Sequence, residues 1–328
     1  MKITIFGVEK WQQEYLKQRI LGHELLCYEK EVHEVKDKEI YESDIVGLFI
    51  FSKANKDVLS KFKNLKLITT LSAGFDHIDL DYCKKNNIIV TNASGYGDNT
   101  VAEMVFSLLL NLTRNTHLAN QRSKTGEISF TGFMGFDLMG KTLGVIGTGR
   151  IGQHTIKIAK GFGMNVVAYD AYPNQGSAEQ LGFEYKNIDE LYAKSDVISL
   201  HTPLLKSTHH MINKESIQKM KQGVIIINTS RGPVIDTLAL LEGLKTGKIG
   251  GAGLDVLEDE ALMMQHKKIP DQEKKIVDAN KEMLKMDNVI ITPHLAFYTK
   301  EAIIRILDMT LTNIYDLIEN RGFRNQIK

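Results

Sequence analysis

Hydrophobic residues in this chain come in short runs separated by amphipathic segments, and this rhythm occurs twice. In the first 92 residues, apolar runs predict strands at 3–6, 45–51, 67–71 and 88–91, and helical patterns predict parts of helices at 58–62 and 78–85. Short strands that alternate with helices are typical of a parallel sheet covered by helices. We therefore expect a first α/β domain in this region.

The second rhythm begins near Thr142 and is more regular. Its apolar runs predict strands at 143–146, 166–170, 197–200, 224–228, 251–255 and 289–292. The stretch 261–286, rich in Met, Lys and Gln, has no clear period and is expected to be irregular. The expected fold class is α/β, with two doubly wound parallel-sheet domains and a cleft between them.

Two long helical patterns flank the second rhythm. Residues 99–114 carry apolar side chains on nearly every side, which predicts a helix buried all round, at the domain junction and perhaps in a subunit interface. Residues 299–320 are apolar on one face only, which predicts an amphipathic helix that returns to the first domain.

Composition narrows the function classes. The 328 residues are 25% charged with a formal net charge of +1, which favours neither nucleic acid nor an anionic membrane as a partner. The apolar stretches are too short to span a bilayer, and the first residues run straight into a strand pattern. Cys27 and Cys83 have no metal-type spacing, so we expect idle thiols in a reducing cytoplasm and no metal site.

The motif GTGRIG at residues 147–152 lies between a predicted strand and a predicted helix at 151–162. Gly147 permits a tight turn, Gly149 lets a pyrophosphate approach the backbone, and Gly152 allows close helix–strand packing. Asp170 ends the next strand, where a carboxylate can accept from ribose hydroxyls and repel a 2′-phosphate. The motif therefore predicts NAD rather than NADP, the alternative being a structural glycine turn without a ligand.

Further polar motifs end the later strands of the second rhythm. They are SLHTP at 199–203, INTSRG at 227–232, GLDVLEDE at 253–260 and ITPHLAFY at 291–298. Because the carboxyl ends of parallel strands meet at one edge of a sheet, these motifs should bring an arginine, carboxylates and a histidine together.

The order and spacing of GTGRIG, NTSRGPVID, GLDVLEDE and TPHLAFYT resemble the D-2-hydroxyacid dehydrogenase family over essentially the whole chain, and within it the D-lactate dehydrogenase group. The resemblance implies a flavodoxin-like substrate domain, residues 1–99 with 299–328, and a Rossmann NAD-binding domain, residues 100–298. Expected cofactor contacts are Gly147, Gly149, Arg150, Ile151, Gly152, Asp170, Thr202, Pro203, Thr229, Ser230, Arg231 and Asp255.

Three residues carry the expected chemistry. Arg231 offers a planar fork that can hold a carboxylate and polarise the adjacent ketone; its alternative is a surface ion pair. His294 would protonate the developing alkoxide, the alternative being a core histidine. The family pattern selects Glu260 from the acidic run 258–260 as the partner of the other imidazole nitrogen. By resemblance, Asp255 binds the nicotinamide carboxamide, unless it only caps its strand.

Substrate contacts in the first domain rest on the resemblance. The loop LSAGFDHID at 71–79 resembles the family's substrate loop, so the amides of Ala73 and Gly74 would bind the substrate carboxylate; an ordinary strand–helix turn stays open. Tyr96, in the sequence SGYGDNTVAE, would lend its hydroxyl, or merely pack. Tyr298 completes the expected substrate contacts.

The predicted reaction is reversible reduction of pyruvate by NADH to D-lactate. Alternatives are larger branched or aromatic 2-oxo acids, and a NAD-sensing corepressor of the same fold. Formate oxidation is disfavoured because that substrate does not need the histidine–glutamate acid. Leu257, Leu295 and the phenylalanines at 130 and 133 depart from the family pattern and put side-chain specificity in doubt. The family implies a homodimer.

Overall fold

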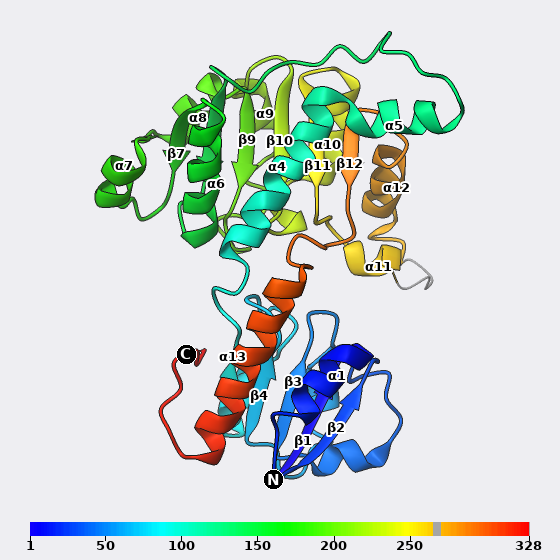
Figure 1. Cartoon of the computed structure of the whole chain (residues 1–328), viewed down its shortest axis with the longest axis vertical. Coiled ribbons are helices and arrows are strands. Elements are labelled where there is room, and N and C mark those ends of the chain that lie inside the picture. Colours follow the sequence, from blue (N-terminus) through cyan, green and yellow to red (C-terminus); the bar gives the residue numbers. More distant parts are fainter. Residues whose placement is uncertain (265–269, 328) are drawn as a thin grey trace. The chain divides into compact units, whose positions relative to one another are not determined.

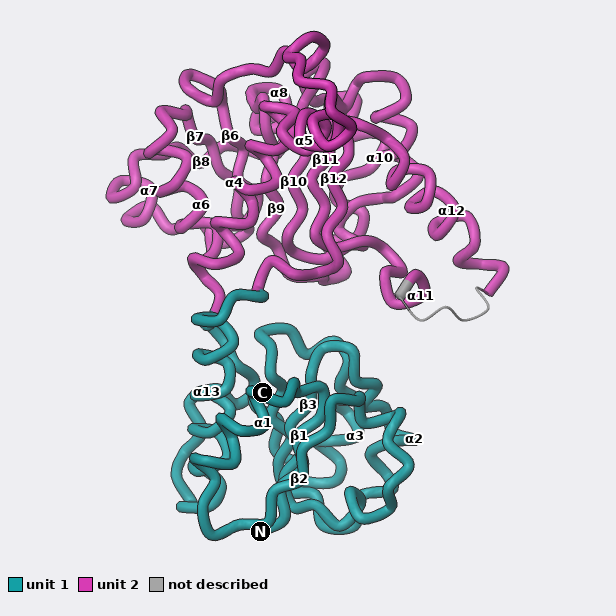
Figure 2. Tube along the Cα trace, turned by 45° about the vertical axis from the view of Figure 1, so that its right-hand side comes forward, with its two compact units in different colours: residues 1–96, 298–328 teal, residues 97–297 magenta. Residues whose placement is uncertain are grey.

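The computed structural model describes residues 1–264 and 270–327, which divide into two compact units. Unit 1 comprises residues 1–96 and 298–328, and unit 2 comprises residues 97–297 (Figure 2). The first unit is therefore discontinuous in sequence. Its first segment ends at residue 96, where 99 was expected, and its second segment begins at residue 298, where 299 was expected.

In unit 1 the described strands form one parallel sheet in the order β2-β1-β3-β4-β5, the flavodoxin-like order (Figure 1). Its strands are β1 (Lys2–Phe6), β2 (Glu24–Tyr28), β3 (Ile45–Leu48), β4 (Leu67–Thr70) and β5 (Ile89–Thr91). Four of these strands were predicted; β3 ends earlier than expected, and the sequence pattern missed β2. Strand β2 lies at the sheet edge, where its side chains are only half-buried or exposed and give no continuous apolar run.

The helices of unit 1 are α1 (Lys10–Lys17), α2 (Lys56–Leu59), α3 (Leu80–Lys85), α13 (Lys300–Ile318) and the 3₁₀ turn η1 (Lys38–Glu42). Thr299 caps α13 by accepting from the Ala302 amide. Helix α13 buries Ile303, Ile306 and Ile314 and packs against β4 and α1, which confirms its predicted return to the first domain.

In unit 2 the described strands form a parallel sheet in the order β12-β11-β10-β9-β6-β7-β8. They are β6 (Thr142–Ile146), β7 (Asn165–Tyr169), β8 (Glu184–Tyr185), β9 (Val197–Leu200), β10 (Val224–Asn228), β11 (Ile249–Leu254) and β12 (Val289–Ile291). The order reverses between β6 and β9, as in a Rossmann domain. All six predicted strands are present, and only the two-residue edge strand β8 was missed.

Unit 2 carries most of the helices. They are α4 (Asp98–Arg114), α5 (Thr116–Lys124), α6 (Arg150–Gly161), α7 (Gln175–Leu181), α8 (Ile188–Lys194), α9 (Lys214–Lys219), η2 (Gly232–Val234), α10 (Thr237–Lys245), α11 (Glu260–Met264) and α12 (Lys274–Met283). The stretch 261–286, predicted to be irregular, therefore contains most of α11 and all of α12, whose buried residues are Val277, Ala279, Asn280 and Met283. Residues 265–269 of that stretch lie outside the described residues.

Helix α4 corrects a second expectation. It packs on β11, β10, β12 and α6 of its own unit, where Gly253 admits it closely, since a Cβ added there would lie 2.9 Å from Leu108 Cβ. It is not buried all round, because Asn99, Glu103, Ser107 and Arg114 form an exposed stripe along it. The number of apolar residues in this segment did not reveal the stripe. Its members are separated by one or two helical turns, so they lie on one face of the helix.

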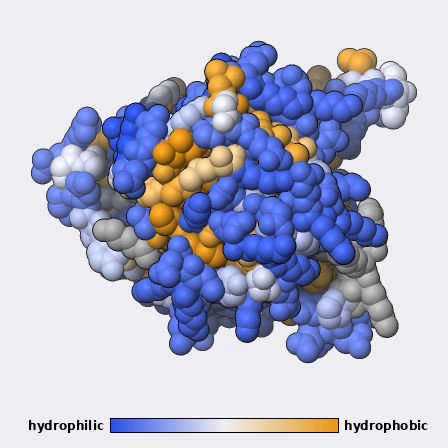
Figure 3. Space-filling model, turned by 90° about the horizontal axis from the view of Figure 1, so that it is seen from below, coloured by the Kyte–Doolittle hydropathy of each residue, from blue (hydrophilic) through white to orange (hydrophobic). Residues whose placement is uncertain are grey.

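Figure 3 shows a face on which hydrophilic residues predominate and hydrophobic residues gather in a band. No helix in the part of the chain that the structure describes combines the length and hydrophobicity needed to span a bilayer.

Candidate active site

The glycine loop joins β6 to α6 and has the backbone geometry of a phosphate cradle. Gly147 has φ +95°, and a Cβ there would lie 2.7 Å from the His201 carbonyl oxygen. A Cβ at Gly152 would lie 2.1 Å from the Gly147 carbonyl oxygen, so only glycine lets α6 start this close to β6. Around a Cβ at Gly149, no described residue other than its chain neighbours lies within 4 Å. The loop is packed at two glycines and open at the third, which fits a pyrophosphate at the helix N-terminus.

Asp170 follows β7 and supports this loop. Its Oδ2 accepts from the Thr148 amide at 2.6 Å and the Thr148 hydroxyl at 2.9 Å, and its Oδ1 accepts from the Tyr172 amide at 2.9 Å. The Thr148 hydroxyl also meets the Tyr185 hydroxyl at 2.7 Å. A carboxylate has about four acceptor sites, so Oδ1 retains capacity for a ribose hydroxyl. Sequence reasoning missed Thr148, although it stands inside the glycine motif.

Arg150 and Ile151 open helix α6. The Arg150 Nε lies 3.4 Å from Asp98 Oδ2 at the start of α4, and the arginine side chain is largely exposed. An exposed pair of this kind contributes little to stability. Ile151 is half-buried in the first turn.

Two threonines at the ends of neighbouring strands carry unused hydroxyls. Thr202 follows β9 and Thr229 follows β10, and the Oγ1 of each is buried without a hydrogen-bond partner among the described residues. Buried polar atoms in native proteins normally have partners. Both threonines were predicted to contact the cofactor, and their unused capacity fits a polar ligand at this edge. Pro203 follows Thr202 and is exposed.

Asn228 shapes the turn that presents Arg231. Its Oδ1 accepts from the Ser230 amide at 3.0 Å and the Ser230 hydroxyl at 2.8 Å, while its Nδ2 donates to the Arg231 carbonyl at 2.9 Å. Arg231 is half-buried, and its Nη1 donates to the Ser230 carbonyl at 2.8 Å. An asparagine two residues before a serine is a turn signal that sequence reasoning did not use.

Gly232 ties this turn to the acidic segment. A Cβ at Gly232 would lie 2.1 Å from the Leu257 carbonyl carbon, so the Arg231 turn and the segment 257–260 touch backbone to backbone. The structure thus brings Arg231 and Glu260 onto adjoining loops at the carboxyl end of the sheet of unit 2.

His294 and Glu260 form a hydrogen-bonded pair. His294 Nδ1 lies 2.8 Å from Glu260 Oε1, and both side chains are mostly buried, at 19% and 27% exposure. Glu260 Oε2 accepts from the Leu257 amide at 3.2 Å, which orients the carboxylate. The pairing predicted from the family pattern is present, and it leaves Nε2 as the ring nitrogen that can exchange a proton with a ligand.

Asp255 holds the turn on which His294 lies. Its Oδ1 accepts from the Thr292 hydroxyl at 2.5 Å and the Leu295 amide at 2.9 Å, and its Oδ2 accepts from the Ala296 amide at 2.9 Å. His294 itself has φ +53° and donates its amide to the Asp255 carbonyl at 2.8 Å. This buried carboxylate therefore does more than cap its strand: it fixes the backbone of the histidine turn. Contact with a carboxamide stays a prediction.

The other two acids of the run 258–260 face elsewhere. Glu258 Oε1 lies 2.9 Å from His210 Nε2, away from the His294 pair. Asp259 has φ +57°, and burial, with the charges of Glu258 and Glu273, raises its pKa.

His201, before Thr202, meets the Ser199 hydroxyl at 2.8 Å, and burial lowers its pKa to about 4. His201 is thus neutral at physiological pH.

In unit 1 the loop 71–79 follows β4. Ser72 is buried and donates its hydroxyl to the Gly74 carbonyl at 2.6 Å, and Asn92 Nδ2 donates to the Ala73 carbonyl at 2.8 Å. The amides of Ala73 and Gly74 donate to no group among the described residues. The loop therefore holds two adjacent carbonyls fixed and leaves two amides available to an anion.

Tyr96 and Tyr298, the two substrate tyrosines predicted from the resemblance, are the residues at the edges of unit 1. The Tyr96 carbonyl accepts from Arg305 Nε at 2.6 Å. The Tyr298 hydroxyl donates to Glu9 Oε1, and this bond raises the tyrosine pKa. Glu9 Oε2 also accepts from Trp11 Nε1 at 3.0 Å, so one carboxylate aligns both rings.

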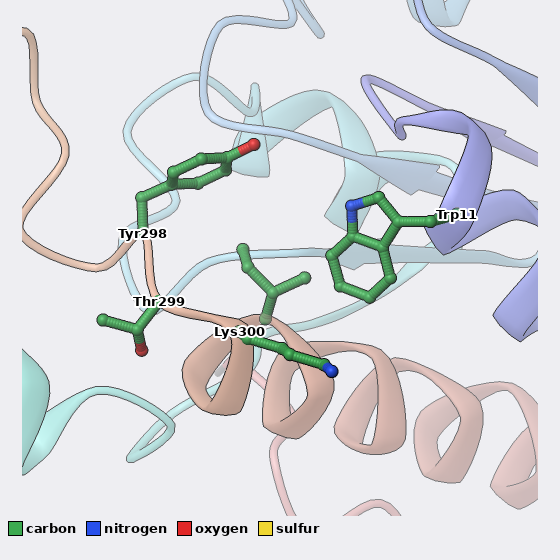
Figure 4. A pocket seen from close by; sticks show the side chains of 5 residues that line it. Trp11, Tyr298, Thr299 and Lys300 are labelled. Atoms are coloured by element: carbon green, nitrogen blue, oxygen red, sulfur yellow. The ribbon is translucent and has the colours of Figure 1, made fainter.

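Tyr298 and Trp11 line a hollow of about 360 Å³, together with Thr299, Lys300 and Ile303. Figure 4 shows the two rings extending toward one another from opposite sides, over the first turn of α13. A smaller pocket of about 80 Å³ adjoins it, also lined by Tyr298, at the carboxyl ends of β1, β3 and β4.

Comparison with known proteins agrees with this geometry. Residues 106–296 match the family described as D-isomer specific 2-hydroxyacid dehydrogenase, NAD binding domain. The chain is 36% identical to the D-lactate dehydrogenase of Escherichia coli K12 over all of both chains. It is 43% identical to an aromatic 2-oxoacid reductase of Clostridium sporogenes, covering 83% of this chain and 82% of the relative.

Among solved structures, the D-lactate dehydrogenase of Aquifex aeolicus complexed with NAD and lactic acid superposes with a TM-score of 0.87. It is 38% identical, covering 97% of this chain and 96% of that one. The NAD-type glycine loop, the histidine–glutamate pair and these similarities agree, and the chain belongs to the D-isomer specific 2-hydroxyacid dehydrogenase family, whose members are NAD-dependent oxidoreductases of 2-oxo acids.

Proposed function

We propose that this enzyme reduces pyruvate to D-lactate with NADH, and catalyses the reverse reaction. The observation that carries the proposal is the His294–Glu260 pair, joined at 2.8 Å, in which Glu260 follows the segment 257–258 that adjoins the Arg231 turn. A 2-oxo acid presents a carboxylate beside a ketone, so it needs one group that holds an anion and one that gives a proton. Arginine and a paired histidine supply these two functions.

NAD, bound at the glycine loop and at Asp170, supplies or accepts the hydride. Arg231 binds the substrate carboxylate with its planar fork and polarises the ketone oxygen. His294 gives the proton on Nε2 to the oxygen as the alkoxide develops, and takes it back from the hydroxyl in the oxidative direction. Glu260 fixes the ring orientation through Nδ1 and stabilises the charged imidazolium.

The contacts proposed in unit 1 complete the recognition of the substrate. The Ala73 and Gly74 amides, which donate to no described group, bind the substrate carboxylate as neutral donors. Tyr96 and Tyr298 contact the rest of the substrate. Replacing Tyr96 or Tyr298 by phenylalanine tests these two contacts. The KM for pyruvate should rise, and the affinity for NADH should not fall.

A second candidate substrate class is the larger branched or aromatic 2-oxo acids. The hollow of about 360 Å³ beside Tyr298, walled by Trp11, is the observation that favours it. The 43% identity to an aromatic 2-oxoacid reductase is in line with this candidate. A ring could stack against the Trp11 and Tyr298 faces, whereas a methyl group would leave this hollow unfilled.

Initial rates with NADH decide between the two substrate classes. We would compare kcat/KM for pyruvate, 2-oxobutyrate, 2-oxoisocaproate, phenylpyruvate and hydroxypyruvate, and determine the chirality of each product. The proposal predicts the highest value for pyruvate and a D product. A higher value for phenylpyruvate, reduced by Trp11→Ala, would establish the second candidate. An L product would contradict the family reaction itself.

We also propose that the enzyme is a homodimer. Several large apolar side chains in the segment after α5 are strongly exposed within one chain: Ile128 at 82%, Phe130 at 92% and Met134 at 95%. Exposed apolar groups clustered in one segment mark an interaction site. Arg122 stacks on the Phe133 ring at 3.9 Å and anchors this segment to α5.

We further propose a cytoplasmic location. Cys27 and Cys83 are both free, and burial raises the pKa of each thiol to about 11. Such thiols resist oxidation and are typical of a reducing compartment.

A further inference from the structure

Three metal-ligand side chains gather in unit 2 away from the His294 pair. His209, His210 and Glu258 each offer one ligand atom, and these atoms all lie within 4.8 Å of one another. Within the residues that the structure describes, no other group of three or more His, Cys, Asp or Glu side chains has this geometry. Nothing in the proposed hydride transfer uses it.

The backbone turns both imidazoles to the same side. His210 has φ +51°, in the left-handed region, where histidine occurs more often than most other residues. The His209 and His210 rings stack with centroids 3.9 Å apart and planes at 28°. The stacked pair places both imidazoles beside Glu258.

Two of the three side chains that would bind an ion, those of His210 and Glu258, are held in place by other contacts. The His210 amide donates to the Pro233 carbonyl at 2.8 Å, which fixes its loop. Glu258 Oε2 accepts from the Thr237 hydroxyl at 2.8 Å, and the Glu258 carbonyl accepts from Asn280 Nδ2 at 2.8 Å. Glu258 Oε1 is left facing His210 Nε2 at 2.9 Å, while His209 is exposed and able to rotate.

The chemistry of the three ligand atoms determines which kind of ion could bind here. Two imidazoles and one carboxylate suit zinc and the neighbouring late transition metals, whereas magnesium and calcium prefer oxygen ligands alone. Bonds of about 2.0–2.2 Å place the ligand atoms of one ion within about 4 Å of each other, so a small rotation of His209 suffices. A plain ion pair between His210 and Glu258 would need no second histidine.

We propose that His209, His210 and Glu258 bind one divalent ion of the zinc class, with water in the remaining positions. Such an ion would link the loop before α9 to the segment 257–260, whose Glu258 also accepts from Thr237 at the start of α10. It would stabilise that part of unit 2 by an amount that grows with the logarithm of the free ion concentration above Kd. No sequence motif marks the site, because the carboxylate stands 48 residues after His210.

Titration of the untagged, chelator-treated full chain with zinc chloride tests the proposal. Isothermal calorimetry should give one zinc per chain, and zinc at about a hundred times Kd should raise the Tm by roughly 5 °C. His209→Ala and Glu258→Gln should each weaken binding by at least about tenfold. His23→Ala, which removes a histidine outside the cluster, should bind zinc like the wild type.

Absence of saturable binding to the wild type would overturn the proposal. Unchanged affinity in either His209→Ala or Glu258→Gln would also overturn it, because all three side chains are required. Glu258→Gln keeps an acceptor for Thr237, and circular dichroism checks its fold. Should that variant unfold, the exposed His209→Ala decides alone. Rates with NADH and pyruvate, measured without zinc, should match the wild type in His209→Ala, which separates this site from hydride transfer.

Discussion

At the residue scale, Asp170 both supports the glycine loop and presents a charge where the ribose is proposed to bind. Asp170→Ala removes the acceptor of the Thr148 amide, a hydroxyl acceptor and a repulsive charge together. We expect a higher KM for NADH and a weaker preference over NADPH. Asp170→Asn removes the charge and keeps one oxygen acceptor for Thr148 but loses the acceptor that the Tyr172 amide uses, so it should relax the preference with less effect on NADH than alanine. Steady-state kinetics with both cofactors measures this, and a wild type that already prefers NADPH would refute it.

Arg231 tests the geometry of anion binding. Arg231→Lys keeps the positive charge but loses the planar fork. We expect kcat/KM for pyruvate to fall by the equivalent of about 2–5 kcal/mol, as for truncation of a buried charge pair. The Kd for NADH, from fluorescence titration, should change far less. Equal losses in both quantities would mean that Arg231 supports the fold or the cofactor instead.

At the scale of elements, the carboxyl ends of the strands in unit 2 could be predicted because the apolar runs there are continuous. Strands β9 and β10 begin and end where the sequence predicted, and each is buried throughout. The motifs that follow them, with Arg231 and Thr202, were therefore placed on the correct edge. The His294–Glu260 pairing was predicted from the family pattern, since the sequence alone offered three acids at 258–260.

Other elements were not predictable from local pattern. Strand β2 and helix α12 carry mixed surfaces that tertiary packing stabilises, so no clean period marks them. The polar partners Thr148 and Asn228 were also missed, because their roles depend on contacts with Asp170 and with the Arg231 turn. The hollow beside Tyr298 joins Trp11 to α13 across almost the full sequence, which no local signal reveals.

His201, at the end of β9, makes a prediction about stability. Burial lowers its pKa from 6.5 to about 4, so the folded state disfavours the proton that the unfolded chain accepts. Stability from the neutral ring is therefore complete above pH 6.5 and is lost as the pH falls toward 4. The loss should be on the order of 3 kcal/mol, and His201→Gln should show a flatter decline. Tm measured between these pH values tests this; identical slopes in both proteins would refute it.

At the scale of the whole molecule, the exposed apolar segment after α5 predicts a homodimer. Met134→Asp places a charge on a side chain that is 95% exposed in the single chain, so it should not disturb the fold of unit 2. We expect light scattering to show twice the chain mass for the wild type and a shift toward the monomer for Met134→Asp. Leu21→Asp, at a 71% exposed position in unit 1, is the matched control. A monomeric wild type would contradict the dimer.

In the proposed reaction, His294, paired with Glu260, is the acid and base of a reversible hydride transfer. Reduction needs the protonated ring and oxidation the neutral one, so kcat/KM for pyruvate should fall with pH while kcat/KM for D-lactate rises. His294→Ala should cost roughly 10²–10⁴ in rate and remove this dependence. Glu260→Gln withdraws the charge that favours the imidazolium, so reduction should lose rate at a lower pH than in the wild type.

The most direct measurement is kcat/KM in both directions from about pH 5 to 10, for the wild type, Glu260→Gln and the control Asp259→Asn. We expect opposite profiles that move together toward acid in Glu260→Gln and stay in place in Asp259→Asn. Profiles that stay in place in Glu260→Gln, while His294→Ala abolishes the activity, would contradict the pairing.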